Sequence, residues 1–206
     1  MVEGMNHTPQ IKKAIQFAAR KHNGHERITN AQEEPLPYIA HLFSVALLVA
    51  EDLPDGGAGN AHDDIVTAAF LHDTIEDTGT TREEIVAEFN EQVADLVSAV
   101  SEMRGAGGER LDWRQVKEHY LAGMERVSEG ALLIAIADKI DNIESRMEGY
   151  EKGGDAFLAH WLQPNEAYLW FYGESLRIAQ ERLPEHSLTK RLAEVHARQR
   201  ELFAEA

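Results

Sequence analysis

The fold and the chemistry of this chain are both indicated by one stretch, Ala68-Ala69-Phe70-Leu71-His72-Asp73-Thr74-Ile75-Glu76-Asp77-Thr78, in which an apolar run ends in a histidine and three carboxylates. Imidazole nitrogen and carboxylate oxygen are both good ligands for divalent first-row metals. Residues four apart lie on one side of a helix, so the spacing predicts His72 above Glu76 and Asp73 above Asp77. One of these pairs could bind a metal ion while the other acts on a water molecule. The stretch therefore predicts the centre of a metal-dependent hydrolase, against the simpler interpretation of a solvated acidic helix end.

Apolar residues recur at helical spacing on both sides of this stretch. We expect helices over residues 9–22, 39–51, 64–73, 93–100, 110–127, 131–147, 164–183 and 187–204, and a short one that Thr80 or Thr81 caps and that reaches Phe89. Breaks are expected at 23–37, 52–60, 104–108 and 149–155. No strand pattern or internal repeat is visible. The sequence thus predicts an all-α fold of about eight to ten helices in a single domain over 1–206, with a motif core of about 8–150 and C-terminal helices of about 156–206 packing on it.

Composition narrows the classes of function. The 206 residues carry 20 basic and 36 acidic side chains, a formal charge of −16, so a nucleic-acid backbone would be repelled. Cysteine is absent, which excludes disulfides, thiolate zinc sites and cysteine nucleophiles. Any metal ligands must then be nitrogen and oxygen atoms, which favours manganese, iron, cobalt, magnesium or a catalytic zinc.

The chain shows no targeting or membrane segment. Residues 1–10 are polar and lack the apolar core of a secretory signal, and no later stretch is long enough to span a bilayer. We therefore expect a cytoplasmic protein with no membrane partner. The sequence leaves open whether the protein forms a homo-oligomer.

Ionisable residues occur at three places in the apolar helices of this sequence. His41 begins one such helix, His72 and Asp73 end another, and Asp138 lies inside a third. Alone, each histidine would be read as a core residue bonded to a carbonyl, and each aspartate as a cap or an ion-pair partner. One shared metal explains all of them more simply than separate structural roles, provided that the helices converge.

The same residues carry a resemblance to a known family. Tyr38-Ile39-Ala40-His41, the stretch 68–78 and Ala137-Asp138-Lys139-Ile140-Asp141-Asn142 resemble the ordered motifs of the HD-domain metal phosphohydrolases. More narrowly, they resemble the guanosine tetraphosphate hydrolase domain of bifunctional alarmone enzymes and its small stand-alone relatives. The likeness covers roughly residues 8–150, and the pair Glu76-Asp77 is its specific part.

The resemblance implies a role for each matching residue. It implies that one manganese ion is bound by His41, His72, Asp73 and Asp138, although other first-row divalent metals suit the same donors. It implies that Glu76 and Asp77 position or activate the attacking water. For the substrate it implies that Arg27 packs on the guanine and that Asn142 and Ser145 contact the nucleotide, and the nearest cations for screening phosphates are Lys21, Lys139 and Arg27.

The reaction implied is hydrolysis of the 3′-pyrophosphate of guanosine tetra- or pentaphosphate, releasing pyrophosphate and leaving GDP or GTP. The chain departs from the family pattern mainly in the substrate-facing motifs, at His25, Glu26, Ile28, Leu42, Asp141 and Glu144. A phosphatase or pyrophosphohydrolase of another nucleotide, including the 2′-phosphate of NADPH, is therefore the alternative within enzymes.

Two alternatives come from other classes of protein. A non-catalytic HD module could sense a nucleotide, but it would not need the Glu76-Asp77 pair. A helical interaction protein would use the aromatic cluster near the C-terminus, which core packing explains first. The cluster comprises Trp161, Tyr168, Trp170, Phe171 and Tyr172.

Overall fold

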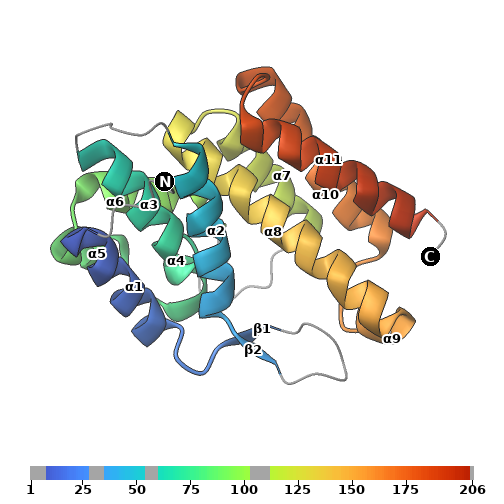
Figure 1. Ribbon diagram of the computed structural model, residues 1–206, viewed down its shortest axis with the longest axis horizontal. Helices are drawn as coiled ribbons and strands as arrows, with labels where there is room; N and C mark the ends of the chain where they lie inside the picture. The colour runs from blue at the N-terminus through green and yellow to red at the C-terminus, as the bar shows by residue number, and fades with distance from the viewer. Residues whose placement is uncertain (1–7, 28–34, 54–59, 103–111, 205–206) are drawn as a thin grey trace, which may run out of the picture.

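One long helix, α8 (Glu129–Gly153), runs through the middle of the molecule, and the other elements surround it (Figure 1). The computed structural model describes residues 8–27, 35–53, 60–102 and 112–204. Helices α2, α3, α6, α9, α10 and α11 all pack directly against α8. The helices other than α8 are α1 (Pro9–Lys21), α2 (Ile39–Asp52), α3 (Asn60–Leu71), α4 (Thr74–Thr78), α5 (Arg82–Glu88), α6 (Glu91–Val100), α7 (Trp113–Met124), α9 (Asp155–Leu158), α10 (Asn165–Arg182) and α11 (Ser187–Phe203).

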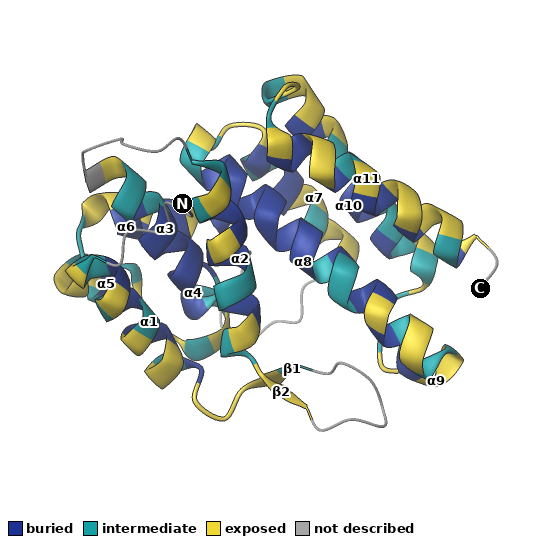
Figure 2. Ribbon diagram, viewed as in Figure 1, coloured by how far each residue is buried: buried dark blue, intermediate teal, exposed yellow. Residues whose placement is uncertain are grey.

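The all-α prediction is confirmed. The described residues form eleven helical segments, of which α4 and α9 are single turns of five and four residues. The core is continuous from α1 to α11, and α8 is buried along most of its length (Figure 2). No helix in the described ranges is long and apolar enough to cross a membrane. The division into one domain stays a prediction.

Helix α8 is longer than the sequence predicted. Its start is fixed by Ser128, whose hydroxyl accepts a hydrogen bond from the amide of Ala131. The prediction of a turn at 149–155 is wrong over most of that range, because the helix continues through Gly149 to Gly153. Gly154, with a φ of +55°, follows as its C-cap. A single glycine costs a helix only about 1 kcal/mol. Packing of Tyr150 against Phe203 accompanies the extra turns.

The helix expected at 64–73 also differs in a way that matters for the site. Helix α3 begins at Asn60 and stops at Leu71, so His72 and Asp73 lie in a turn before α4. The hydroxyl of Thr74 donates to the carbonyl of Leu71 at 2.6 Å, a local bond that competes with helix continuation. His72 and Glu76 therefore do not lie on the same helix, so the predicted placement of His72 above Glu76 on one helix is wrong. Asp73 and Asp77 keep an i,i+4 backbone bond of 2.8 Å.

Two very short strands occur where only a loop was expected. β1 (Glu26–Arg27) pairs antiparallel with β2 (Leu36–Pro37), directly before α2. Two residues are too few to leave an alternating pattern in a sequence. The hairpin brings Arg27 close to the first turn of α2. Ile28 and the glycine-containing break at 104–108 lie outside the described residues, as does the expected start of a helix at 110.

Candidate metal centre and active site

Four side chains from separate segments meet at the centre of the molecule. His41 lies in the first turn of α2, His72 and Asp73 lie between α3 and α4, and Asp138 lies in α8. One ligand atom from each of His41, His72 and Asp73 lies within 4.8 Å of the others. Oδ1 of Asp138 lies 3.2 Å from Nε2 of His41 and 3.7 Å from Nε2 of His72. All four predicted metal ligands are thus brought together.

The two imidazoles both direct Nε2 toward the carboxylates. Nδ1 of His72 lies 2.9 Å from the carbonyl of Ala69, which can only accept, so this nitrogen carries the proton. Nε2 of His72 is buried, lies 3.1 Å from Oδ2 of Asp73 and makes no hydrogen bond of good geometry among the described residues. Nδ1 of His41 lies 2.6 Å from the carboxylate of Asp141, to which it donates, so in the neutral ring Nε2 carries the lone pair that can bind a metal. Two buried imidazole nitrogens and two carboxylates that converge in this way form a donor set that fits a divalent cation.

The charges of the cluster are strongly coupled. Burial lowers the pKa of His41, but hydrogen bonds to the surrounding carboxylates outweigh it and raise the pKa to about 9. Although burial opposes ionisation of Asp73 and Asp138, neighbouring His72 and Lys139 hold the pKa of each carboxyl well below its usual range. Without a metal the histidines serve as counter-ions, so metal binding must displace protons.

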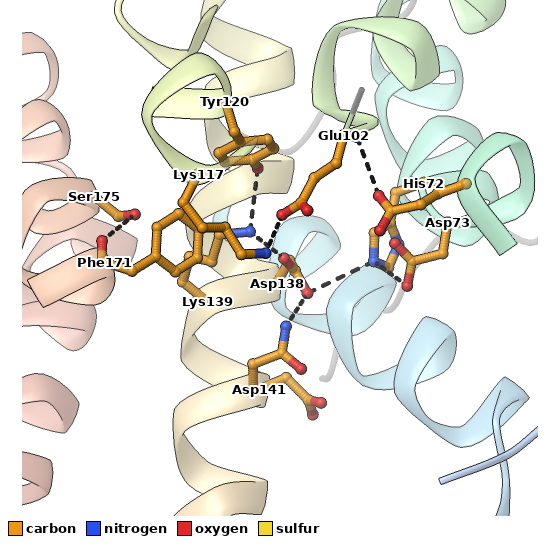
Figure 3. A network of polar contacts seen from close by, with 12 residues as sticks. His72, Asp73, Glu102, Lys117, Tyr120, Asp138, Lys139, Asp141, Phe171 and Ser175 are labelled. Carbon is orange, nitrogen blue, oxygen red and sulfur yellow. Dashed lines mark hydrogen bonds and ion pairs between the residues drawn. The ribbon is translucent and has the colours of Figure 1, made fainter. Parts of the chain in front are cut away.

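Other side chains orient the cluster from outside. The hydroxyl of Tyr38 donates to Oδ2 of Asp73 at 2.6 Å. Lys139 lies beside Asp138 at 2.6 Å and also donates to the hydroxyl of Tyr120 at 3.2 Å, as Figure 3 shows. The amide of Asn142 donates to the other oxygen of Asp138. These contacts fix the carboxylates toward the centre.

Glu76 lines a cavity of about 270 Å³ together with Asp73 and Asp138. One of its oxygens accepts a bond of 3.0 Å from the backbone amide of Glu102, which holds the side chain in place. Burial, followed by the nearby charges of Glu102 and Asp73, raises the pKa of Glu76 to about 7. A carboxylate with that pKa can accept a proton near neutral pH.

The partner in the predicted catalytic pair is placed differently. Asp77 is exposed and does not line the cavity that holds Glu76. The pKa of Tyr38 is raised by burial first and by Asp73 next, and the charge of Asp77 adds to the shift, which places Asp77 near the edge of the site. Of the Glu76-Asp77 pair, only Glu76 lines the cavity.

The predicted nucleotide-binding residues mostly line a second cavity of about 340 Å³. It meets the first one through shared walls of Tyr38, Asn142 and Trp161. Of these two cavities, Arg27 and Ser145 line the second and Lys139 lines the first. Arg27 and Ser145 also line a smaller cavity of about 140 Å³ beside His41 and Asp141. The lining of the second cavity comprises Glu26, Arg27, Tyr38, Asn142, Ser145, Arg146, Phe157, His160 and Trp161.

Lys21 is not brought to either cavity. Its ammonium pairs with Glu84 at 2.7 Å and lies 5.3 Å from the ring of Phe17, between α1 and α5. Lys21 therefore forms an ion pair away from both cavities, where it does not face the expected phosphate site.

Three residues of the site carried no role in the sequence analysis. Tyr38 appeared only as part of a motif, Asp141 only as a departure, and Lys117 not at all. Lys117 pairs with Glu102, and its ammonium lies 4.8 Å from the ring of Phe171 in the wall of the first cavity (Figure 3). No spacing signal links α7 to this site; a basic residue on an amphipathic helix is usually a solvated one.

Comparison with known proteins agrees with this geometry. The family model described as HD domain matches residues 14–154. The chain is 34% identical over 134 residues to human guanosine-3′,5′-bis(diphosphate) 3′-pyrophosphohydrolase MESH1, covering 65% of this chain and 68% of the relative. It is 35% identical over 139 residues to the Aquifex aeolicus guanosine-3′,5′-bis(diphosphate) 3′-pyrophosphohydrolase, covering 68% of this chain but only 18% of that longer protein.

Solved structures show the same fold. One, described as a metazoan ortholog of SpoT that hydrolyses ppGpp, superposes with a TM-score of 0.73 at 24% identity, covering 97% of this chain and 100% of that one. Another, lmo0812 from Listeria monocytogenes, has a TM-score of 0.65 at 22% identity and covers 80% of this chain and 99% of that one. At these identities the likeness concerns the fold alone.

Proposed function

This chain belongs to the HD-domain family, and we propose that it hydrolyses the 3′-pyrophosphate of guanosine tetra- or pentaphosphate, leaving GDP or GTP and pyrophosphate. The observation that carries the proposal is the meeting of His41, His72, Asp73 and Asp138, two of which, Asp73 and Asp138, line one cavity with Glu76. The names of the human and Aquifex relatives support the choice of substrate.

The metal ligands in this proposal are His41, His72, Asp73 and Asp138, and the proposed ion is manganese. A bound divalent cation lowers the pKa of water and offsets charge on phosphoryl oxygens. The nitrogen and oxygen donors suit manganese but do not select it from other first-row metals. The identity of the ion is therefore part of the proposal and is tested by metal analysis.

Glu76 is proposed as the general base. Its carboxylate lies in the cavity, is held by the amide of Glu102, and has a pKa raised to about 7. These features suit the acceptance of a proton from water as oxygen attacks phosphorus. Asp77, exposed at the edge, is proposed to position the water or substrate without taking the proton.

The remaining residues are assigned to the nucleotide. Arg27, Asn142 and Ser145 line the second cavity, which offers space beside the metal centre for the nucleoside. Lys139, buried against Asp138, and Lys117 place positive charge in the first cavity, where pyrophosphate would lie. We leave Lys21 outside the proposed binding set because Glu84 holds it elsewhere.

A substrate panel tests the proposal. Guanosine tetraphosphate, guanosine pentaphosphate, ATP and NADPH would each be incubated with the manganese-loaded protein, and pyrophosphate and phosphate release measured separately. We expect pyrophosphate from the guanosine substrates and its loss in Glu76→Gln. Release of phosphate from NADPH, or turnover of ATP alone, would show that the substrate is another nucleotide and would leave the proposed metal centre unchanged. The cytoplasmic location and any homo-oligomer stay predictions.

A further inference from the structure

One carboxylate oxygen joins the metal centre to the nucleotide cavity. Oδ2 of Asp141 lies 2.6 Å from Nδ1 of His41 and 3.1 Å from Nη1 of Arg27. The three residues come from α8, α2 and β1, so Asp141 ties together segments that are 100 residues or more apart in the chain. Asp141 itself is buried at 9% exposure.

The contact with His41 concerns metal binding. A histidine that binds a metal through Nε2 needs a partner for its Nδ1 proton, and that partner fixes both the tautomer and the ring orientation. His72 uses the neutral carbonyl of Ala69 for this purpose. His41 uses the charged carboxylate of Asp141, which also makes its Nε2 a stronger donor.

The contact with Arg27 concerns the nucleotide. Arg27 donates a second bond of 2.9 Å to the side-chain oxygen of Asn142, whose amide donates to Asp138. Its guanidinium is therefore held at two corners before any ligand arrives, with a side chain only 15% exposed. A guanidinium fixed in this way keeps its orientation in the cavity wall at little further cost in entropy.

We propose that Asp141 is a positioning residue that orients His41 for the metal and Arg27 for the nucleotide through the same oxygen. The nucleotide half rests on the proposed function, whereas the metal half does not. If Asp141 only held the three segments together, its loss would lower the stability of the fold without changing the affinity for the metal. A structural role and a positioning role of Asp141 therefore give different results.

The metal half is tested by titrating chelator-treated protein with Mn²⁺ alone in a calorimeter. Asp141→Asn keeps the shape of the side chain and can still accept from His41, but it lacks the charge. We expect its Mn²⁺ affinity to fall about 10- to 100-fold. Glu144→Gln is the matched control, since Glu144 lies on the same helix and pairs with Arg191 at the surface. Unchanged Mn²⁺ affinity in folded Asp141→Asn would overturn this half.

A second measurement needs no variant that could fail to fold. In ¹⁵N-histidine-labelled wild type loaded with diamagnetic Zn²⁺, the His41 Nδ1 proton should be observed strongly deshielded by the carboxylate. A His41 ring with a bare Nδ1 would contradict the proposal even if Asp141→Asn were unfolded.

The nucleotide half is tested with GDP as the probe. Asp141→Asn and Arg27→Met should each weaken GDP binding by about tenfold, and the double variant should bind little worse than Arg27→Met, because both act through one contact. Equal GDP affinity in wild type and Asp141→Asn would remove this half. If the substrate panel shows no hydrolysis of the guanosine substrates but Asp141→Asn binds Mn²⁺ more weakly than wild type, the proposed substrate is rejected. The metal half of this proposal is then kept.

Discussion

The hydroxyl of Tyr38 donates a 2.6 Å hydrogen bond to Oδ2 of Asp73, the carboxylate oxygen that also faces both His41 and His72. Tyr38 is itself held by His22, whose ring stacks on it with centroids 5.0 Å apart and planes 11° from parallel. The last residue before α2 therefore orients a ligand that belongs to a different segment.

Tyr38→Phe should keep this stacking but remove the bond to Asp73. We expect Mn²⁺ affinity to fall about tenfold, because the carboxylate loses the donor that fixes its orientation. Isothermal titration calorimetry measures this. Tyr150→Phe is the control, since Tyr150 packs against Phe203 away from the metal centre. An equal effect of both changes would show that the Tyr38 hydroxyl has no specific role.

The two carboxylates of the motif should differ in their contribution to catalysis. Glu76→Gln should lower kcat by about 10²- to 10⁴-fold, the contribution typical of a general base, while Mn²⁺ still binds. Asp77→Asn should have a smaller effect, because Asp77 is exposed and outside the cavity lining. Steady-state kinetics at saturating Mn²⁺ would decide, and a larger loss in Asp77→Asn would exchange the two roles.

The rate should depend on the protonation of Glu76. Its pKa is raised to about 7, mainly by burial, and a general base works only when deprotonated. The rate should therefore decline as pH falls, with a midpoint at or below about pH 7, because a bound cation adds positive charge that moves this pKa downward. The midpoint is read from kcat/KM against pH, and a profile for residual Glu76→Gln activity that kept the same midpoint would assign it to another group.

Removal of the metal should make stability depend on alkaline pH. The pKa of His41 is raised from 6.5 in the unfolded chain to about 9 in the metal-free fold. This contribution to stability is complete below pH 6.5 and is lost as pH rises through 9. The unfolding temperature of chelator-treated protein should fall over that range, and added Mn²⁺ should restore it by mass action. Differential scanning calorimetry measures both, and His41→Gln should flatten the decline.

Two glycines should respond oppositely to alanine. A methyl group on Gly130, in the first turn of α8, would lie 2.9 Å from Cγ1 and Cδ1 of Ile65 on α3. We expect Gly130→Ala to destabilise the protein by about 1–3 kcal/mol through overpacking. Gly123, inside α7, has open space at the same position, so Gly123→Ala should stabilise by about 0.5–1 kcal/mol. Urea denaturation compares them, and equal signs would contradict the packing argument.

The sequence by itself determined most of the helices and the chemistry of the central cluster. Apolar spacing is local information, and so are the capping residues: Thr81 accepts from the amide of Glu84, as one of the two predicted caps should. The resemblance marked the four ligand positions because their motifs are short and ordered along the chain. The convergence of those residues was an assumption that the structure then met.

Only the tertiary structure decided how the side chains of the site are oriented and which residues line its cavities. The contacts of Asp141 with His41 and of Lys117 with Glu102 depend on how α8, α2 and α7 pack. Such contacts join residues far apart in the chain, and no local spacing records them. The same packing excluded Lys21 and separated Asp77 from Glu76, because distance in the folded molecule, unlike adjacency in the chain, decides which charges face the cavity.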